Sequence, residues 1–283
     1  MKRRNYFSTR TGIIADTPEI NLDTLKRLYI ITYDKLEKEG YFQEYFGVDC
    51  VDLEKVGELG TDIDSVIFVN IHKDDLWPLR IKIRDYTEDD LFDMIEFMHD
   101  HCTKPISGTY HSYNNCGYHY NVFSEEDGHQ DYREKLNDIL KDYKEGYEIS
   151  VKGEILSLPE ADLAPLLLAS IPSDDQQNII SKIELSTNKF RKYKSSLADR
   201  KDALRELADI LEFLRPQIKL SLISKDENDL FNIINNFEIR HHNPQQKNHY
   251  DKAIWYSWMF YFYLATIHAA LRLIEKNKSN LKL

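Results

Sequence analysis

Helical spacing of apolar residues is the clearest pattern in the first half of the chain. Residues 22–38 approximate this spacing, and Asn21 or Thr24 can cap the first turn. A second helix is expected over residues 87–101, where a capping threonine precedes three acidic residues in the first turn. Residues 131–143 predict a third helix. Helices are therefore expected to dominate this half.

Other stretches of the first half predict strands and turns. Residues 65–71 form a short run rich in β-branched side chains, so we expect a strand there. Apolar and polar residues alternate over residues 145–156, on both sides of Val151-Lys152-Gly153, which predicts a small hairpin. A short helix is expected over residues 52–59, and a loop rich in Gly, Asn and Tyr over residues 104–128. The first part is therefore predicted to be α+β.

Beyond a break at Ile171-Pro172-Ser173 the pattern is helical throughout. We place a domain boundary near Pro172, between an acidic N-terminal domain (1–172) and a helical domain (173–283). Helical periodicity covers four segments, residues 175–193, 197–214, 227–239 and 250–275. Pro216 is expected to kink or end the second of them. The fold class is mainly α, with an α+β N-terminal domain followed by a four-helix bundle.

The most hydrophobic segment, residues 253–274, raises the question of a membrane span. His268 and Arg272 interrupt it, and it is rich in Tyr and Trp, so a buried helix is expected instead. No secretory signal is evident near Met1, and three cysteines cannot form a disulfide framework. We expect a soluble cytoplasmic protein with no membrane contact.

The net charge of −11 is unevenly distributed. Residues 174–283 hold 18 basic and 14 acidic side chains, a net of +4. Residues 1–173 hold 19 basic and 34 acidic side chains, a net of −15. This balance argues against broad nonspecific binding of duplex nucleic acid, but it permits local action on a polyanion.

The segment from Asn235 to Asp251 concentrates one arginine, three histidines and six carboxamides between two predicted helices. Arginine presents a planar fork of donors that suits phosphate oxygens. Histidine can remove a proton from a ribose 2′-hydroxyl or donate one to the leaving oxygen, and this chemistry needs no metal. The candidate catalytic residues are Arg240, His249, His241 and His242. The candidate RNA contacts are Asn243, Gln245 and Lys247, with Lys192 and Lys194 from the basic run 189–201. The alternative is that the positive charge of Arg240 stabilises the C-terminal end of the preceding helix and that the histidines are ordinary solvent-exposed side chains of a loop.

A helical bundle with an arginine and polar residues just before its last helix resembles the HEPN superfamily. Many HEPN domains are metal-independent RNases of toxin–antitoxin, CRISPR and phage-defence systems, and their sites are generally completed across a two-fold interface. The resemblance therefore implies an endoribonuclease without a cofactor, acting on RNA as a homodimer. Arg240-His241 matches the first half of the HEPN motif, whereas eight residues separate Arg240 from His249, more than in that motif. There are three alternatives. A longer loop lets His249 act as the base, or His241 or His242 takes that role instead. In the third alternative the domain is a noncatalytic binding or dimerisation module.

The N-terminal stretch from Tyr6 to Ile13, followed by Glu19-Ile20, resembles the opening of AbiJ-type abortive-infection proteins. In those proteins this domain usually precedes a HEPN-type domain. The two resemblances imply an antiphage effector whose N-terminal domain senses or regulates. They also imply a second defence-system protein or a phage trigger as a partner. Residues 40–170 carry no motif of either family.

A second group of candidate residues suggests zinc. Cys116 and His119 form a Cys-x-x-His pair, and His99 or Cys102 could complete a tetrahedral set, with His111 nearby. The alternatives are a packed loop rich in Tyr and His, and aromatic side chains that stack on a base. Because the spacing matches no standard zinc finger, our main expectation remains a protein without a metal.

Overall fold

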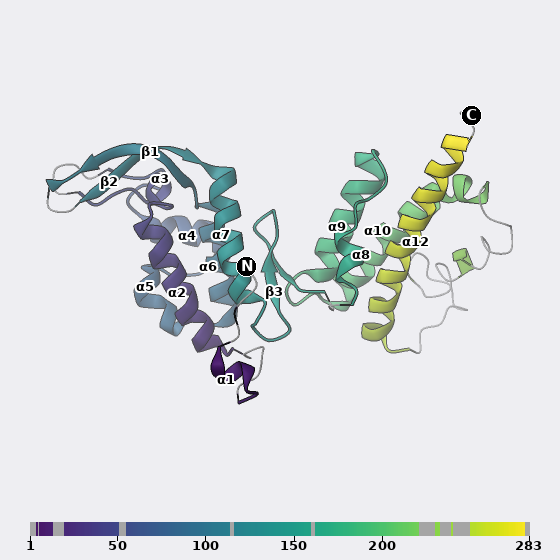
Figure 1. Cartoon of the computed structure of the whole chain (residues 1–283), viewed down its shortest axis with the longest axis horizontal. Helices are drawn as coiled ribbons and strands as arrows, with labels where there is room; N and C mark the ends of the chain where they lie inside the picture. Colours follow the sequence, from purple (N-terminus) through teal and green to yellow (C-terminus); the bar gives the residue numbers. More distant parts are fainter. Residues whose placement is uncertain are drawn as a thin grey trace. The chain divides into compact units, whose positions relative to one another are not determined.

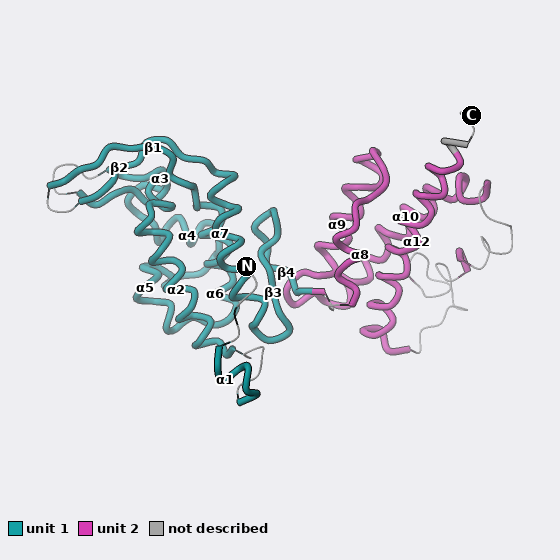
Figure 2. The backbone as a smooth tube through the Cα atoms, viewed as in Figure 1, with its two compact units in different colours: residues 1–158 teal, residues 159–283 magenta. Residues whose placement is uncertain are grey.

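The chain forms two compact units, residues 1–158 and 159–283 (Figures 1 and 2). The computed structural model describes residues 4, 6–13, 20–50, 55–113, 116–159, 162–220, 230–232, 239 and 250–280, without the side chains of 278–280. Helices make up most of both units, which confirms the mainly α prediction. The boundary predicted near Pro172 lies within the second unit, after helix α8 (Ala164–Leu168), whose Leu166 and Leu167 pack against that unit's core.

Unit 1 is built around three long helices. Its helical elements are α1 (Phe7–Arg10), α2 (Leu22–Lys38), α3 (Gln43–Phe46), α4 (Ile63–Ile71), α5 (Leu79–Lys82), the 3₁₀ turn η1 (Ile83–Asp85), α6 (Glu88–Asp100) and α7 (Glu125–Leu140). Helix α7 packs against α2 and α6, and the buried hydroxyls of Tyr29 and Tyr132 lie 3.2 Å apart between them. The predicted helices 22–38 and 87–101 are confirmed, with Asn21 capping α2 and Thr87 forming a capping box with Asp90.

The strand predicted over residues 65–71 is wrong, because helix α4 occupies this stretch. Asp62 caps the helix by accepting a hydrogen bond from the backbone N–H of Ser65, and His72 ends it in the left-handed conformation. The buried side chains Ile63 and Ile67 are four residues apart, so they lie on one helical face. Capping and burial therefore outweigh the β preference of the branched residues.

Two antiparallel hairpins complete unit 1. Strands β1 (Lys104–His111) and β2 (Gly117–Ser124) pair where a loop was predicted, so that prediction is wrong. Helix α7 starts directly after β2, at Glu125 rather than near residue 131, because Ser124 caps it. Strands β3 (Tyr147–Ile149) and β4 (Ile155–Ser157) confirm the hairpin predicted over residues 145–156.

The short helix predicted over residues 52–59 does not form over residues 55–59, the described part of this stretch. Lys55 pairs with Val48 in an isolated antiparallel bridge, and residues 56–59 contain a turn. Residues 51–54 lie outside the described part of the chain.

Unit 2 is helical, as predicted. After α8 come a π-helical turn η3 (Gln176–Ile180), α9 (Ser181–Arg191), α10 (Leu197–Lys219) and α12 (Lys252–Asn280). Helix α10 contacts both α9 and α12, and Phe190 of α9 stacks on Phe260 of α12 at 4.0 Å between ring centroids. Pro216 lies inside α10, which continues to Lys219. Of the helix predicted over residues 227–239, the described residues are 230–232, which are helical, and Ile239.

Helix α12 contains the most hydrophobic segment of the chain. Met259, Phe260 and Leu264 of this helix are buried in the core of unit 2. Among the described residues, no helix has the length and apolar character that crossing a membrane requires. The segment is therefore a core helix in this structure, as its composition predicts.

Candidate functional site

The arginine–histidine segment predicted as an RNase site lies outside the described residues. Those candidates are Arg240, His241, His242, Asn243, Gln245, Lys247 and His249. The residues at both of its ends are described. Ile239 is fully buried, and its carbonyl accepts a hydrogen bond from Nε of Arg205 on α10 at 2.8 Å. Asp251 caps α12 by accepting from the backbone N–H groups of Ala253 and Ile254. Both ends of the segment are thus attached to the helical core of unit 2.

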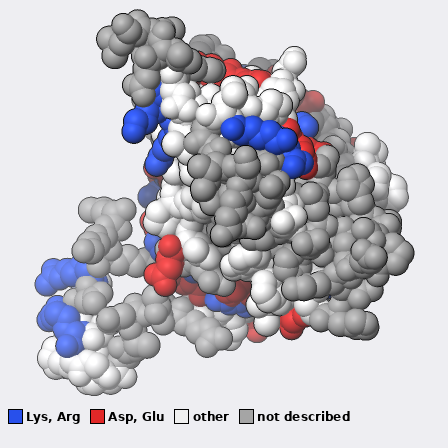
Figure 3. Space-filling model, turned by 90° about the vertical axis from the view of Figure 1, so that its right-hand side faces the viewer, with Lys and Arg blue, Asp and Glu red and all other residues white. Residues whose placement is uncertain are grey.

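The two lysines predicted to contact RNA lie in the turn between α9 and α10. Lys192 and Lys194 are exposed, and the ammonium of Lys194 lies 4.9 Å from the ring centroid of Tyr193. Nearby Lys189 pairs instead with Glu206. On the face drawn in Figure 3, the described basic and acidic side chains are interspersed and form no continuous basic surface.

The cysteines and histidines predicted as a zinc set do not all converge. Sγ of Cys116 lies 2.9 Å from Nε2 of His119, so this half of the set is close together. Cys102 is instead fully buried, and its thiol donates to the carbonyl of Gly128 at 3.7 Å. Burial raises the pKa of the Cys102 thiol well above its ordinary value. The ring of His99 stacks on His129 with centroids 4.2 Å apart. The prediction that His99 or Cys102 completes the zinc-ligand set is therefore wrong.

Two residues outside that set complete a four-membered cluster. Cys50, His111, Cys116 and His119 each offer one ligand atom, and these atoms all lie within 4.8 Å of one another. Sγ of Cys50 lies 3.5 Å from Nδ1 of His111. Cys50 is buried and the other three are half-buried. We call these four residues the converging group.

The β1–β2 hairpin positions the two histidines. In its register His111 pairs with Gly117, and Thr109 pairs with His119. Residues that pair directly, or that are two apart on a strand, share one face of a hairpin. His111 and His119 are therefore diagonal neighbours on one face, with ring centroids 5.3 Å apart. Cys116 directly precedes β2 and completes the hairpin's contribution.

A loop from another part of unit 1 brings Cys50 to the hairpin. The Val48–Lys55 bridge closes this loop. The side chain of Gln43 pairs with the outer edge of β2, donating to the carbonyl of Tyr118 at 3.0 Å and accepting from the N–H of Tyr120 at 3.1 Å. Nζ of Lys55 donates to the carbonyl of Tyr120 at 3.0 Å. These contacts hold β2 beside the loop.

Sequence analysis named His111 beside the Cys116–His119 pair without assigning it as a ligand, and it did not name Cys50. Reading residues 104–124 as a hairpin would have placed His111 and His119 on the same face. Cys50 has no local signal, because it lies 61 positions before His111 in the sequence and only the tertiary fold joins them. Thiolate and imidazole are ligands for zinc and related divalent metals, so the converging group can hold such an ion.

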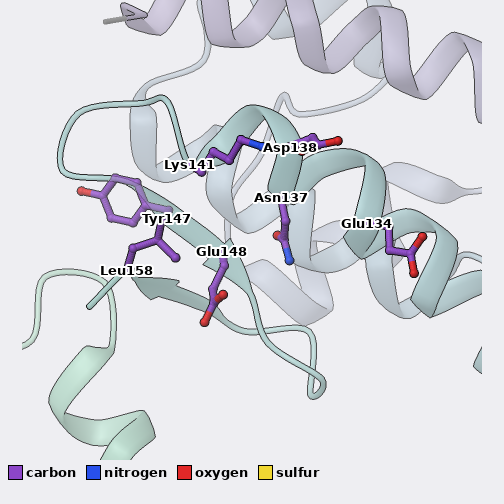
Figure 4. Close-up of a pocket in the computed structure, with 7 residues that line it drawn as sticks. All are labelled: Glu134, Asn137, Asp138, Lys141, Tyr147, Glu148 and Leu158. Atoms are coloured by element: carbon purple, nitrogen blue, oxygen red, sulfur yellow. Dashed lines mark hydrogen bonds and ion pairs between the residues drawn. The ribbon is translucent and has the colours of Figure 1, made fainter. Parts of the chain in front are cut away.

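A surface pocket of about 420 Å³ lies between α7 and the β3–β4 hairpin of unit 1 (Figure 4). Its lining residues are Glu134, Asn137, Asp138, Lys141, Tyr147, Glu148 and Leu158. The side-chain amide of Asn137 donates to the carbonyl of Ile149 and accepts from its N–H. The ammonium of Lys141 pairs with the carboxylate of Asp138. The lining contains no cysteine, serine or histidine.

Comparison with known proteins identifies no family for this chain. No protein-family model matches it, and neither a curated protein nor a solved structure matches it. The HEPN and AbiJ assignments therefore depend on the sequence resemblances alone.

Proposed function

We propose that this protein is an antiphage effector of the HEPN type, in which unit 2 cleaves RNA through Arg240 and a histidine. The observation that carries the proposal is the attachment of both ends of the Arg240–His249 segment. Ile239 is buried and bonded to Arg205, and Asp251 caps α12. These flanking residues fix where the segment leaves and rejoins the helical core of unit 2, and a defined position is what catalytic groups require.

The proposed reaction needs no metal. A histidine, His249 or one of the pair His241 and His242, removes the proton of a ribose 2′-hydroxyl. The 2′-oxygen then attacks the adjacent phosphorus, and the bond from phosphorus to the 5′-oxygen breaks. An acid, such as a second histidine, protonates the leaving 5′-oxygen, so the products carry a 2′,3′-cyclic phosphate and a 5′-hydroxyl. Arg240 binds the phosphate oxygens as negative charge builds on them.

Helix α12 offers a surface for the homodimer that a HEPN site implies. Ile254, Trp255 and Trp258 near its start are exposed by 38% or more, and the two tryptophan rings are 5.4 Å apart between centroids. Exposed apolar side chains that cluster in this way favour protein–protein contact. The patch lies on the turns that follow Asp251, so a two-fold contact there would bring the N-terminal ends of two α12 helices near each other.

A noncatalytic role in binding or dimerisation is the second candidate. The eight residues between Arg240 and His249 favour it, because they depart from the HEPN spacing. In this case unit 2 would recognise RNA or a second defence protein, and unit 1, whose 19 basic and 32 acidic side chains give a net charge of −13, would regulate it.

Cleavage by purified protein, and toxicity on expression in cells, separate the two candidates. We expect Arg240→Ala and His249→Ala each to reduce the cleavage rate by about 100-fold or more without added Mg²⁺. Lys276→Ala and His72→Ala change exposed residues of the same kinds outside the segment, and they should retain full activity.

Loss of activity in the His241→Ala/His242→Ala double variant, with His249→Ala active, would assign the base to that pair. Cleavage that survives both Arg240→Ala and removal of all three histidines would refute the nuclease site. Wild-type protein that binds RNA or a partner without cleaving RNA would favour the noncatalytic role.

A further inference from the structure

We propose that the converging group, Cys50, His111, Cys116 and His119, binds one Zn²⁺ ion that fastens the β1–β2 hairpin to the body of unit 1. The site does not depend on the RNase proposal, since all of its residues lie in unit 1. Two cysteines and two histidines form a common ligand set for structural zinc.

The distances fit a single tetrahedral ion. Zinc–sulfur bonds of about 2.3 Å and zinc–nitrogen bonds of about 2.0–2.1 Å separate tetrahedral ligands by roughly 3.3–3.8 Å. In the converging group the Cys116–His119 and Cys50–His111 atom pairs are 2.9 and 3.5 Å apart, and no pair exceeds 4.8 Å. A tetrahedral sulfur–nitrogen pair is about 3.6 Å apart, so the Cys50–His111 pair already fits and the Cys116–His119 pair would widen by roughly 0.7 Å.

The ligand chemistry selects zinc and a structural role. Two thiolates balance the charge of one divalent cation, and the soft sulfur ligands disfavour magnesium and calcium. Four protein ligands fill a tetrahedral shell and leave no position for a reacting water. The partial burial of all four residues limits solvent access to such an ion. A closed shell of this kind stabilises a fold rather than catalysing a reaction.

The position of the cluster explains why the hairpin needs such a link. A two-stranded hairpin is only marginally stable by itself, and β1–β2 has register irregularities near Ser107. Figure 1 shows the hairpin reaching along one edge of unit 1. Three ligands come from the end of the hairpin at which β1 finishes and β2 begins, and Cys50 comes from the loop after α3. One ion would therefore cross-link segments 61 residues apart.

Metal analysis of the full chain tests the proposal, with any affinity tag removed. We expect about one zinc per chain in washed wild-type protein, because tight sites survive washing. Cys50→Ser and His111→Ala should fall below about 0.2 zinc per chain, a loss of at least fivefold. Cys102→Ser is the matched control, since it changes a buried cysteine outside the group, and it should keep its zinc.

A second measurement on wild-type protein covers the case in which the variants fail to fold. Removal of zinc with a chelator should lower the unfolding temperature of unit 1 by roughly 10 °C, and one equivalent of Zn²⁺ should restore it. Co²⁺ added to the chelated protein should give the intense visible absorption of tetrahedral cobalt with thiolate ligands.

Several results would overturn the proposal. Wild-type protein that contains no zinc and takes up neither Zn²⁺ nor Co²⁺ would exclude the site. Equal zinc in wild type and Cys50→Ser would place the metal elsewhere. Iron with acid-labile sulfide, or a Cys50–Cys116 disulfide in protein purified under reducing conditions, would contradict the zinc assignment.

Discussion

Unit 1 contains two groups made from the same residue types, and they differ in what their side chains do. In the converging group, sulfur and nitrogen atoms of four side chains lie within 4.8 Å of one another. In the second group, which we call the packed group, His99, Cys102 and His129 make other contacts. The two imidazole rings stack face to face, and the thiol donates to a backbone carbonyl. Residue type alone therefore does not identify a metal site.

The difference follows from the elements that carry each group. His99 and His129 lie on α6 and α7, two packed helices, and Cys102 follows α6 directly. His99 and Cys102 are buried in the core, and His129 is half-buried beside them. The converging group lies on a hairpin and a loop that Gln43 and Lys55 hold together mainly through polar contacts. There the sulfur and nitrogen atoms of four side chains turn toward one another instead.

Thiol labelling should show the largest contrast between the groups. In chelated wild-type protein we expect Cys116 to react faster than Cys102 by at least roughly a thousandfold. Cys102 is fully buried with a raised pKa, so its labelling requires an opening that costs about 5 kcal/mol or more. Peptide mass spectrometry after timed alkylation measures both rates in one sample.

Two further conditions sharpen the labelling comparison. With Zn²⁺ restored, Cys116 should be protected as well, whereas Cys102 should not change. In denaturant both thiols should react at similar rates. Labelling of Cys102 as fast as Cys116 in native buffer would show that the packed group is not core.

The helices of both units could largely be predicted from the sequence, because their signals are local. Helix α2 spans the predicted residues 22–38, and the Thr87 cap marks the start of α6. The failures arise where burial in the tertiary fold overrides a local signal. Residues 65–71 have β-branched side chains, but the Asp62 cap and the burial of one helical face decide the structure. Sequence cannot weigh such tertiary burial against propensity.

The site could be predicted only in part, for a similar reason. Cys116 and His119 are three residues apart, so their proximity is visible in the sequence and the structure confirms it. His111 depends on the pairing of β1 with β2, which the Gly- and Tyr-rich sequence and the irregular register obscure. Cys50 depends on the packing of α3 against β2, a contact between distant segments. The Arg240 segment remains a prediction from sequence.

Gly128→Ala should have the next largest effect, and it should act on the packed group alone. Alanine favours a helix over glycine by roughly 1 kcal/mol. A Cβ at Gly128 in α7, however, would lie 2.5 Å from the carbonyl oxygen of Cys102 and 2.5 Å from Cα of Thr103. Because backbone cannot easily move aside, we expect the unfolding free energy to fall by about 1–3 kcal/mol. Urea denaturation measures this change.

The control for Gly128→Ala is Gln130→Ala, an exposed substitution on the same helix that should change stability by less than about 0.5 kcal/mol. Zinc content should stay the same in both variants, because neither touches the converging group. A Gly128→Ala protein more stable than wild type would show that helix propensity prevails and that α7 does not approach Cys102 this closely.

The smallest expected effect is a pH dependence that belongs to the packed group. Burial, and then the neighbouring His99, lower the pKa of His129 from 6.5, while Glu125 and Asp100 act in the opposite direction. The unfolded chain therefore binds a proton more readily than the folded protein, so stability falls as pH decreases below about 6.5, until the folded-state pKa is reached.

His129→Gln removes this titration. The difference between the wild-type and His129→Gln stability curves cancels the contributions of groups unaffected by the substitution, provided that both proteins carry the same metal load. We expect that difference to change with pH below about 6.5 and to be constant above about 7.5. A difference that is flat across this range would mean that His129 is solvated, and the distinction between a packed and a converging group would then rest on Cys102 alone.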